Sequence, residues 1–242
     1  MSLQHLGCPA ALVGVLGDDA AGDLVLAQAV ADGLWISGIT RRDVATALQV
    51  DVVEASGTRR LLEDVPDPTL LRPDDVSAAA ALLERARAVV LQLRQPGPAL
   101  RTALAATGPR ALRVAEGVPA DEETRTGVLR QVHLLRADAL EAGVWVGSEL
   151  DGLDDVRAAV RELCSAGPRV VSLAAGEDGD LTVWREPSGR LGEVLVPPLG
   201  EGDPGAGAAA ALAEVRPGNR PRLDPEEVGR LADRARRDAD AR

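Results

Sequence analysis

The stretch GEGDPGAGAAAALA, residues 200–213, decides the fold expected for this chain. It follows a strand-like segment, residues 192–196, and two prolines that cannot continue a strand interior. It then enters a run of alanines with high helix propensity. Glycines at such a strand-to-helix turn leave backbone N–H groups free at the helix N-terminus, where these donors and the helix dipole favour an anion. The stretch therefore predicts a phosphate-binding turn, although Asp203 alone is also consistent with a plain helix N-cap.

Outward from this turn, apolar segments of strand length alternate with helical patterns along the chain. Strands separated by single helices imply parallel pairing with right-handed crossovers. We therefore predict an α/β fold, a doubly wound three-layer sandwich with a mostly parallel central sheet, in one domain over residues 1–242. Strands are expected at 10–16, 88–93, 111–115, 132–135 and 170–174, and helices at 19–32, 74–87, 98–107, 121–130, 139–146 and 151–166.

Two hairpins interrupt this alternation. Residues 48–55 and 60–64, joined by Ser56-Gly57-Thr58, predict a small β flap over about residues 47–65. A second hairpin is expected from residues 181–185 and 193–196, and residues 235–242 are expected to form a disordered tail. Because ligands of doubly wound folds bind beyond the carboxyl ends of the strands, segments 138–141, 176–179 and 200–203 are the candidate site segments.

Composition excludes several classes of function. The formal net charge of −11 over 242 residues argues against binding to nucleic acid or to an anionic membrane. Cys8, Cys164, His5 and His133 lack metal-ligand spacing, so no metal bound directly by His or Cys is expected. Neither a signal peptide nor an apolar run of bilayer-spanning length is recognised, and a cytoplasmic location is predicted.

Several motifs along the chain resemble, in one order, those of the PfkB, or ribokinase-like, sugar kinases. The similar family motifs are LG…VGxGDDxxG, Gln-Leu-Glu-x-Pro, Asn-x-x-Glu-Ala, Thr-x-Gly-x-x-Gly, Gly-Ala-Gly-Asp and a C-terminal Pro-Gly-Ala segment. They correspond here to residues 6–22, 89–96, 138–142, 174–179, 200–203 and 216–227. The resemblance covers nearly the whole chain and implies the ribokinase-like three-layer α/β/α sandwich with its small β flap.

The resemblance also implies a reaction, the ATP-dependent phosphorylation of a sugar or related small hydroxyl compound. Asp203 falls on the family's catalytic base, which takes the proton of the attacking hydroxyl. The backbone amides of Gly200, Glu201, Gly202 and Asp203 fall on its anion hole, which holds the charge developing on the transferred phosphoryl group.

The resemblance further implies the cofactors and partners, which are ATP, Mg²⁺ and a sugar. Ala174, Gly176 and Gly179 fall on the nucleotide-binding segment, where small residues allow close approach. Asp138 and Glu141 fall on the residues that organise magnesium and phosphate, usually through water. In this family the flap covers the sugar and can pair between subunits, so a homodimer is a further expectation.

The chain also departs from the family pattern. The family's first strand, with its sugar-binding aspartate, is expected ahead of residue 1, and about one helix is missing after residue 214. The family's Asn and Thr become Asp138 and Ala174, and Glu201 places a carboxylate where it would oppose phosphate. Two functions stay open: a working kinase with a divergent sugar site, or a catalytically impaired or inactive truncated homologue that acts as a binding protein. A plain α/β binding module is the third alternative.

Overall fold

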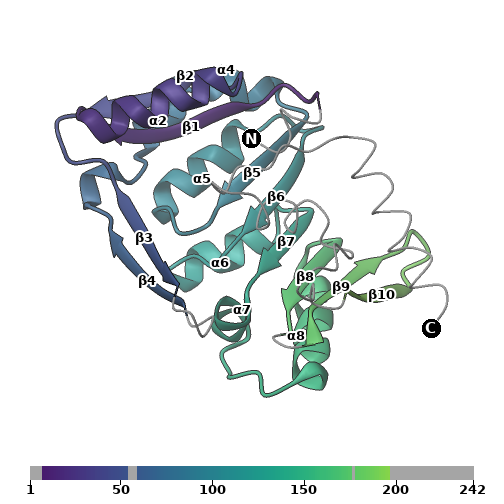
Figure 1. The fold of residues 1–242 in the computed structure, drawn as a ribbon. Coiled ribbons are helices and arrows are strands. Elements are labelled where there is room, and N and C mark those ends of the chain that lie inside the picture. The colour runs from purple at the N-terminus through teal and green to yellow at the C-terminus, as the bar shows by residue number, and fades with distance from the viewer. Residues whose placement is uncertain (1–6, 54–58, 176–177, 197–242) are drawn as a thin grey trace.

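The computed structural model describes residues 7–53, 59–175 and 178–196, and its helices and strands alternate along much of the chain (Figure 1). The strands are β1 (Ala11–Gly17), β2 (Trp35–Arg42), β3 (Leu48–Val53), β4 (Arg59–Asp64), β5 (Ala88–Gln92), β6 (Leu112–Glu116), β7 (Leu134–Ala137), β8 (Val170–Ala174), β9 (Asp180–Arg185) and β10 (Leu191–Val196). The helices are α2 (Ala20–Ala31), η1 (Asp67–Thr69), α3 (Pro73–Ala78), α4 (Ala80–Arg85), α5 (Gly97–Ala106), α6 (Glu122–Leu129), α7 (Ala139–Val146) and α8 (Leu153–Ala166).

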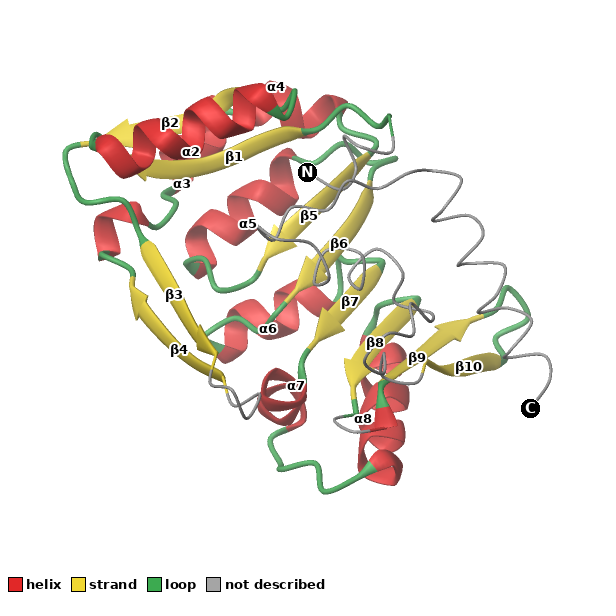
Figure 2. Cartoon of the chain, viewed as in Figure 1, coloured by secondary structure: helices red, strands yellow, loops and turns green. Residues whose placement is uncertain are grey.

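A six-stranded sheet in the order β10-β9-β8-β7-β6-β5 forms the body of the fold. Strands β5 to β8 pair in parallel, and β9 and β10 extend the sheet as an antiparallel hairpin. Helices connect the parallel strands, as Figure 2 shows. The predicted α/β architecture with a mostly parallel central sheet is thereby confirmed, as are the flap β3–β4 and the hairpin β9–β10.

Registered partners on the parallel strands show where the core lies. Leu91, Ala115, Leu135, Val171 and Val183 occupy matching positions from β5 to β9, and each is 6% exposed or less. Because successive side chains of a strand point to opposite faces, these residues mark the face that packs against the helices. The other face is less covered in the described part of the chain: its Val90 is 57% exposed and its Leu112 47%.

Strand β2 and the break between α3 and α4 differ from the sequence-based expectation. Residues 35–42 were not expected to form a strand, because Gly38 and two arginines interrupt the apolar pattern. Pairing with β1 makes them one, and Gly38 is needed there because a Cβ would lie 2.6 Å from the Leu12 carbonyl oxygen. The single helix expected over 74–87 is divided at Ala79, whose ψ of 6° departs from helical geometry.

The β1–β2 pair forms a sheet of its own beside the six-stranded sheet. Among the described strands, none pairs with the second edge of β1 or with the second edge of β5. A buried ion pair between Arg42 and Asp75 instead joins β2 to α3, and Arg42 also donates to the carbonyls of Pro68 and Leu70. Within the described residues, side-chain contacts and no backbone ladder therefore join the two-stranded sheet to its neighbours.

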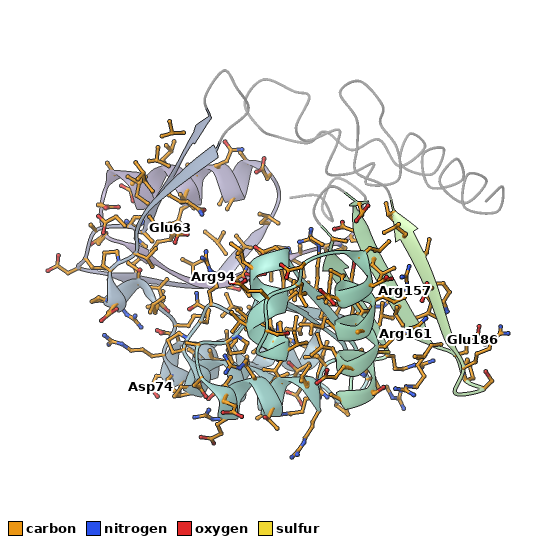
Figure 3. The ribbon with its side chains drawn as sticks, turned by 90° about the horizontal axis from the view of Figure 1, so that it is seen from below. Glu63, Asp74, Arg94, Arg157, Arg161 and Glu186 are labelled. Atoms are coloured by element: carbon orange, nitrogen blue, oxygen red, sulfur yellow. The ribbon has the colours of Figure 1, made fainter. Side chains whose placement is uncertain are left out.

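Among the described residues, one exposed ion pair links the base of the flap to the loop after β5. Arg94, in the loop after β5, lies 3.0 Å from Glu63 of β4, and both side chains are labelled in Figure 3. The segment after β5 also binds the chain just before α3, because the Leu71 N–H donates to Gln95 Oε1 at 2.9 Å. No helix among the described residues is long and apolar enough to span a membrane.

Candidate functional site

Polar side chains meet at the carboxyl ends of β5, β6 and β7. Gln92, Glu116 and Arg136 are registered partners on these three adjacent strands. Arg136 Nη1 lies 3.0 Å from Glu116 Oε1, and the two side chains are 51% and 44% exposed. The same row continues on β8 and β9, where the Thr182 hydroxyl donates to Ser172 Oγ at 2.8 Å. This edge of the sheet is the one where ligands of open α/β folds bind.

Gly117, the residue after β6, lies at the centre of this edge. It is buried and has a φ of 96°, a conformation that favours glycine. A Cβ at this position would lie 3.1 Å from Gln92 Oε1 and 3.3 Å from Glu141 Oε1. Two side-chain oxygens from different elements therefore approach one point, and the absence of a side chain on Gly117 leaves room for both.

A capping box orients Glu141 at the start of α7. The Asp138 carboxylate accepts a hydrogen bond from the Glu141 N–H at 2.8 Å, and Glu141 Oε2 accepts one from the Asp138 N–H at 3.0 Å. Because Oε2 is used by the cap, Oε1 is the oxygen that faces Gly117. Carboxylate and amide oxygens suit Mg²⁺ or the water molecules around it. Within the described residues no three His, Cys, Asp or Glu side chains gather as a metal site.

The turn between β8 and β9 holds two of the predicted nucleotide-binding residues. Ala174 ends β8 and pairs with Asp180 of β9. Gly179 has a φ of 101°, and its carbonyl accepts a hydrogen bond from the Ala175 N–H at 2.6 Å. Because β8 is the neighbour of β7, this turn and the start of α7 follow adjacent strands at the same sheet edge.

The remaining predicted site residues fall outside the described part of the chain. These are Gly176 and the segment Gly200, Glu201, Gly202 and Asp203. The assignment of Asp203 as base, and of the amides of 200–203 as anion hole, stays a prediction. The structure thus brings Asp138 and Glu141 together with each other, and sets Ala174 and Gly179 on the adjoining turn.

Several residues at this edge were not predicted from the sequence to have a role in the site. Gln92 was quoted only within a motif, and Glu116, Gly117 and Trp145 were not assigned a role. The available signal was position, because Gln92 and Glu116 are the last residues of their strands and Gly117 follows directly. Trp145 carried no such signal: its role depends on a contact with Gly117, 28 positions away in sequence.

Comparison with known proteins identifies the family of this chain. A model of the pfkB family of carbohydrate kinases matches residues 1–200. The chain belongs to the pfkB carbohydrate kinase family. Membership places it among the ATP-dependent carbohydrate kinases as a class. None of the curated protein sequences matches the chain significantly.

Solved structures of ribokinases share the fold of this pfkB family member. Ribokinase from Thermotoga maritima is 17% identical, with a TM-score of 0.71 over 96% of this chain and 84% of that one. Ribokinase from Arabidopsis thaliana, complexed with ribose and ATP, is 18% identical, with the same TM-score and coverage. Ribokinase II from E. coli, in complex with ATP and Mg²⁺, is 15% identical, with a TM-score of 0.71 over 96% of this chain and 86% of that one. At these identities the likeness concerns the fold alone.

Proposed function

We propose that this pfkB-family protein transfers a phosphoryl group from ATP, with Mg²⁺, to a hydroxyl group of a sugar or related small compound. The observation that carries the proposal is the approach of Gln92 Oε1 and Glu141 Oε1 to Gly117 at the carboxyl edge of the parallel strands. Solved relatives with ATP, and with ATP and Mg²⁺, support the choice of cofactors.

Glu141 has the chemistry needed to organise magnesium. Its Oε2 is held by the capping hydrogen bond from Asp138, so the carboxylate orientation is set before any ligand binds. Oε1 could then accept hydrogen bonds from water bound to Mg²⁺, and the positive charge of the ion would neutralise part of the charge of the phosphates. In this proposal Asp138 acts chiefly by capping α7, and the Asn-to-Asp change relative to the family keeps that capping ability.

Asp203 is proposed as the base that removes the proton from the attacking hydroxyl. The backbone N–H groups of Gly200, Glu201, Gly202 and Asp203 are proposed to stabilise the charge on the transferred phosphoryl group. This assignment rests on the family signature, since the chain carries Gly-Glu-Gly-Asp at these positions. Ala174, Gly176 and Gly179 are proposed to line the nucleotide site, where small residues let the ligand approach the backbone.

A nucleotide titration with activity measured alongside tests the proposal. ATP with Mg²⁺ should raise the melting temperature, since a ligand selective for the folded state stabilises it. ADP release should depend on an added sugar. Asp203→Asn should lower turnover by about 10²- to 10⁴-fold and leave nucleotide binding intact. Equal turnover in the wild type and Asp203→Asn would remove Asp203 from the mechanism.

Two further variants test the charge distribution of the proposed site. Glu141→Gln should weaken the magnesium-dependent part of nucleotide binding, whereas Glu149→Gln, an exposed glutamate just beyond α7, should leave it unchanged. Glu201→Ala removes a carboxylate beside the proposed phosphate site, so nucleotide affinity should rise, more at low salt than at high salt. An unaltered affinity in Glu201→Ala would place that side chain away from the phosphates.

The alternative is a protein of this family that binds nucleotide without turnover. The unpaired edges of β1 and β5 in the described structure favour it, because a divided sheet holds its strand ends less rigidly than a continuous one. This alternative predicts a magnesium-dependent nucleotide shift in melting temperature with no sugar-dependent ADP release. Turnover with any sugar would eliminate it.

A further inference from the structure

The indole of Trp145 reaches from α7 to the end of β6. Its Nε1–H donates a hydrogen bond to the Gly117 carbonyl oxygen at 2.9 Å. Among the side-chain hydrogen bonds of the described residues, this is the one that links α7 to another element, since those of Asp138 and Glu141 stay within the cap. The ring is half-buried and packs against the hydrophobic core.

Besides Trp145, Val146 packs against the core from α7, and the helix is short and partly exposed. It has 8 residues, and Leu140 and Val144 are 85% and 48% exposed. Ala142 is fully buried, but a methyl group offers little contact area. A helix this short gains its stability from tertiary contacts and not from its own propensity. The Trp145 hydrogen bond therefore adds a directional polar link to the apolar contacts that fix the position of α7.

Trp145 and Glu141 share one face of that helix. They are four positions apart, so their side chains are neighbours on the helix surface. Both reach the same residue, because Trp145 bonds the Gly117 carbonyl and Glu141 Oε1 lies 3.3 Å from the Cβ position of Gly117. Any shift of α7 that breaks the indole hydrogen bond also displaces the Glu141 carboxylate.

We propose that Trp145 is a positioning residue that holds the Glu141 carboxylate at the carboxyl edge of the sheet through its hydrogen bond to Gly117. This inference rests on the proposed function, in which Glu141 organises magnesium and nucleotide. Gly117 contributes to this arrangement in two ways. Its carbonyl oxygen accepts the hydrogen bond from the indole N–H, and its lack of a side chain leaves space for Gln92 Oε1 and Glu141 Oε1. The matched variant is Trp145→Phe, which keeps an aromatic ring and removes the N–H donor.

The first measurement follows backbone hydrogen exchange in the protein without ligand. Trp145→Phe should speed exchange of the α7 amides by about three- to tenfold, the effect of losing one hydrogen bond. Trp35→Phe is the control, since Trp35 lies on β2, is 59% exposed and has no described side-chain hydrogen bond. Equal exchange of α7 in the wild type and Trp145→Phe would overturn the inference, whatever the protein binds.

The second measurement is the affinity for ATP as a function of magnesium concentration. Trp145→Phe should weaken binding in saturating magnesium by about three- to tenfold and leave metal-free binding unchanged. A purely structural role would lower the melting temperature without this magnesium dependence. If the wild type responds to magnesium and Trp145→Phe binds ATP equally well in saturating magnesium, only the positioning role of Trp145 would be overturned. A wild type without magnesium-dependent binding would overturn the proposed function and this inference with it.

Substitutions at two glycines, Gly117 and Gly189, give an independent check on the positioning of Glu141. Gly117→Ala should disturb Gln92 and Glu141, and should weaken magnesium-dependent nucleotide binding at least as much as Trp145→Phe. Gly189→Ala is the matched control, because Gly189 also has positive φ, 85°, but no atom lies within 4 Å of its Cβ position. Both variants carry comparable backbone strain, so equal nucleotide binding in the two would overturn the role assigned to Gly117.

Discussion

The Asp19 carboxylate accepts hydrogen bonds from both the backbone N–H and the hydroxyl of Thr46, at 2.8 and 2.5 Å. Asp19 also caps α2 by accepting from the Gly22 N–H at 2.8 Å, and the Thr46 hydroxyl accepts from the Gly17 N–H at 3.0 Å. The end of β1, the start of α2 and the loop that leads into the flap therefore share one carboxylate. These hydrogen bonds, first that of the Thr46 hydroxyl, lower the pKa of Asp19 to about 2.

The low pKa of Asp19 predicts a specific loss of stability in acid. Because the folded-state pKa lies below the ordinary value of 3.8, the stabilisation is complete above that pH and is lost as the pH falls through about 2. Asp19→Asn should remove this pH dependence, so urea unfolding between pH 5 and 2 should show a shallower decline than in the wild type. Asp43→Asn, at an exposed position nearby, should keep the wild-type slope. An unchanged slope in Asp19→Asn would contradict the prediction.

Removal of Asp75 should destabilise the protein strongly. Asp75 is 8% exposed, pairs with Arg42 and accepts the Arg72 N–H at 2.7 Å. Asp75→Ala should lower the free energy of unfolding by about 3 kcal/mol, since a partly buried guanidinium loses its partner. The neighbouring Asp74, labelled in Figure 3, is exposed, and Asp74→Ala should cost less than about 0.5 kcal/mol. Similar losses in both variants would contradict the role of the ion pair.

Two leucines differ sharply in burial, one on the buried face of the sheet and one on the exposed side of α7. Leu135 is 0% exposed and Leu140 is 85% exposed. Leu135→Ala should lower the free energy of unfolding by about 2–5 kcal/mol, because it opens a cavity in the core, whereas Leu140→Ala should change it by less than about 0.5 kcal/mol. Chemical denaturation of both variants checks the difference. A loss below about 1 kcal/mol in Leu135→Ala would contradict the assigned core.

The flap exposes apolar side chains on neighbouring strands. Val50 and Leu62 are registered partners on β3 and β4, with exposed fractions of 42% and 61%. We expect a second copy of the chain to cover them, because solvent-exposed apolar clusters mark interaction surfaces. Sedimentation should then show a dimer in the wild type and a monomer in Leu62→Asp, whereas Leu24→Asp on α2, which is 71% exposed, should stay dimeric. A monomeric wild type at micromolar concentration would contradict this expectation.

Arg136 should matter more for nucleotide binding than for stability. Its ion pair with Glu116 is half-exposed, and such pairs contribute less than about 1 kcal/mol. Because Arg136 lies on β7, the strand that leads into Asp138 and Glu141, we expect its positive charge to lie near bound phosphates, so Arg136→Gln should weaken nucleotide binding, and more at low salt. Arg130→Gln is the control, because Arg130 is exposed and precedes the amino end of β7. Equal nucleotide affinities in both variants would contradict a phosphate contact by Arg136.

Much of the local structure could be predicted from the chain, because its signals lie within a few residues. The amphipathic pattern of residues 151–166 predicts a helix, which the structure shows as α8 over residues 153–166. The Asp-x-x-Glu spacing of Asp138 and Glu141 is that of a capping box, as observed. The order of the family motifs likewise indicated the ribokinase-like fold. Strand β2 was missed, because its pattern is interrupted and its pairing with β1 depends on chain more than twenty residues away.

The sequence by itself determined the α/β alternation, the flap and the family, since strand periodicity, helix caps and ordered motifs are properties of neighbouring residues. Only the tertiary structure decided that Gln92, Gly117 and Glu141 meet, and that Trp145 reaches the Gly117 carbonyl. The physical reason is strand register. The parallel pairing of β5 with β6 and of β6 with β7 sets which strand ends lie side by side, and this pairing depends on packing between segments that are distant in the chain.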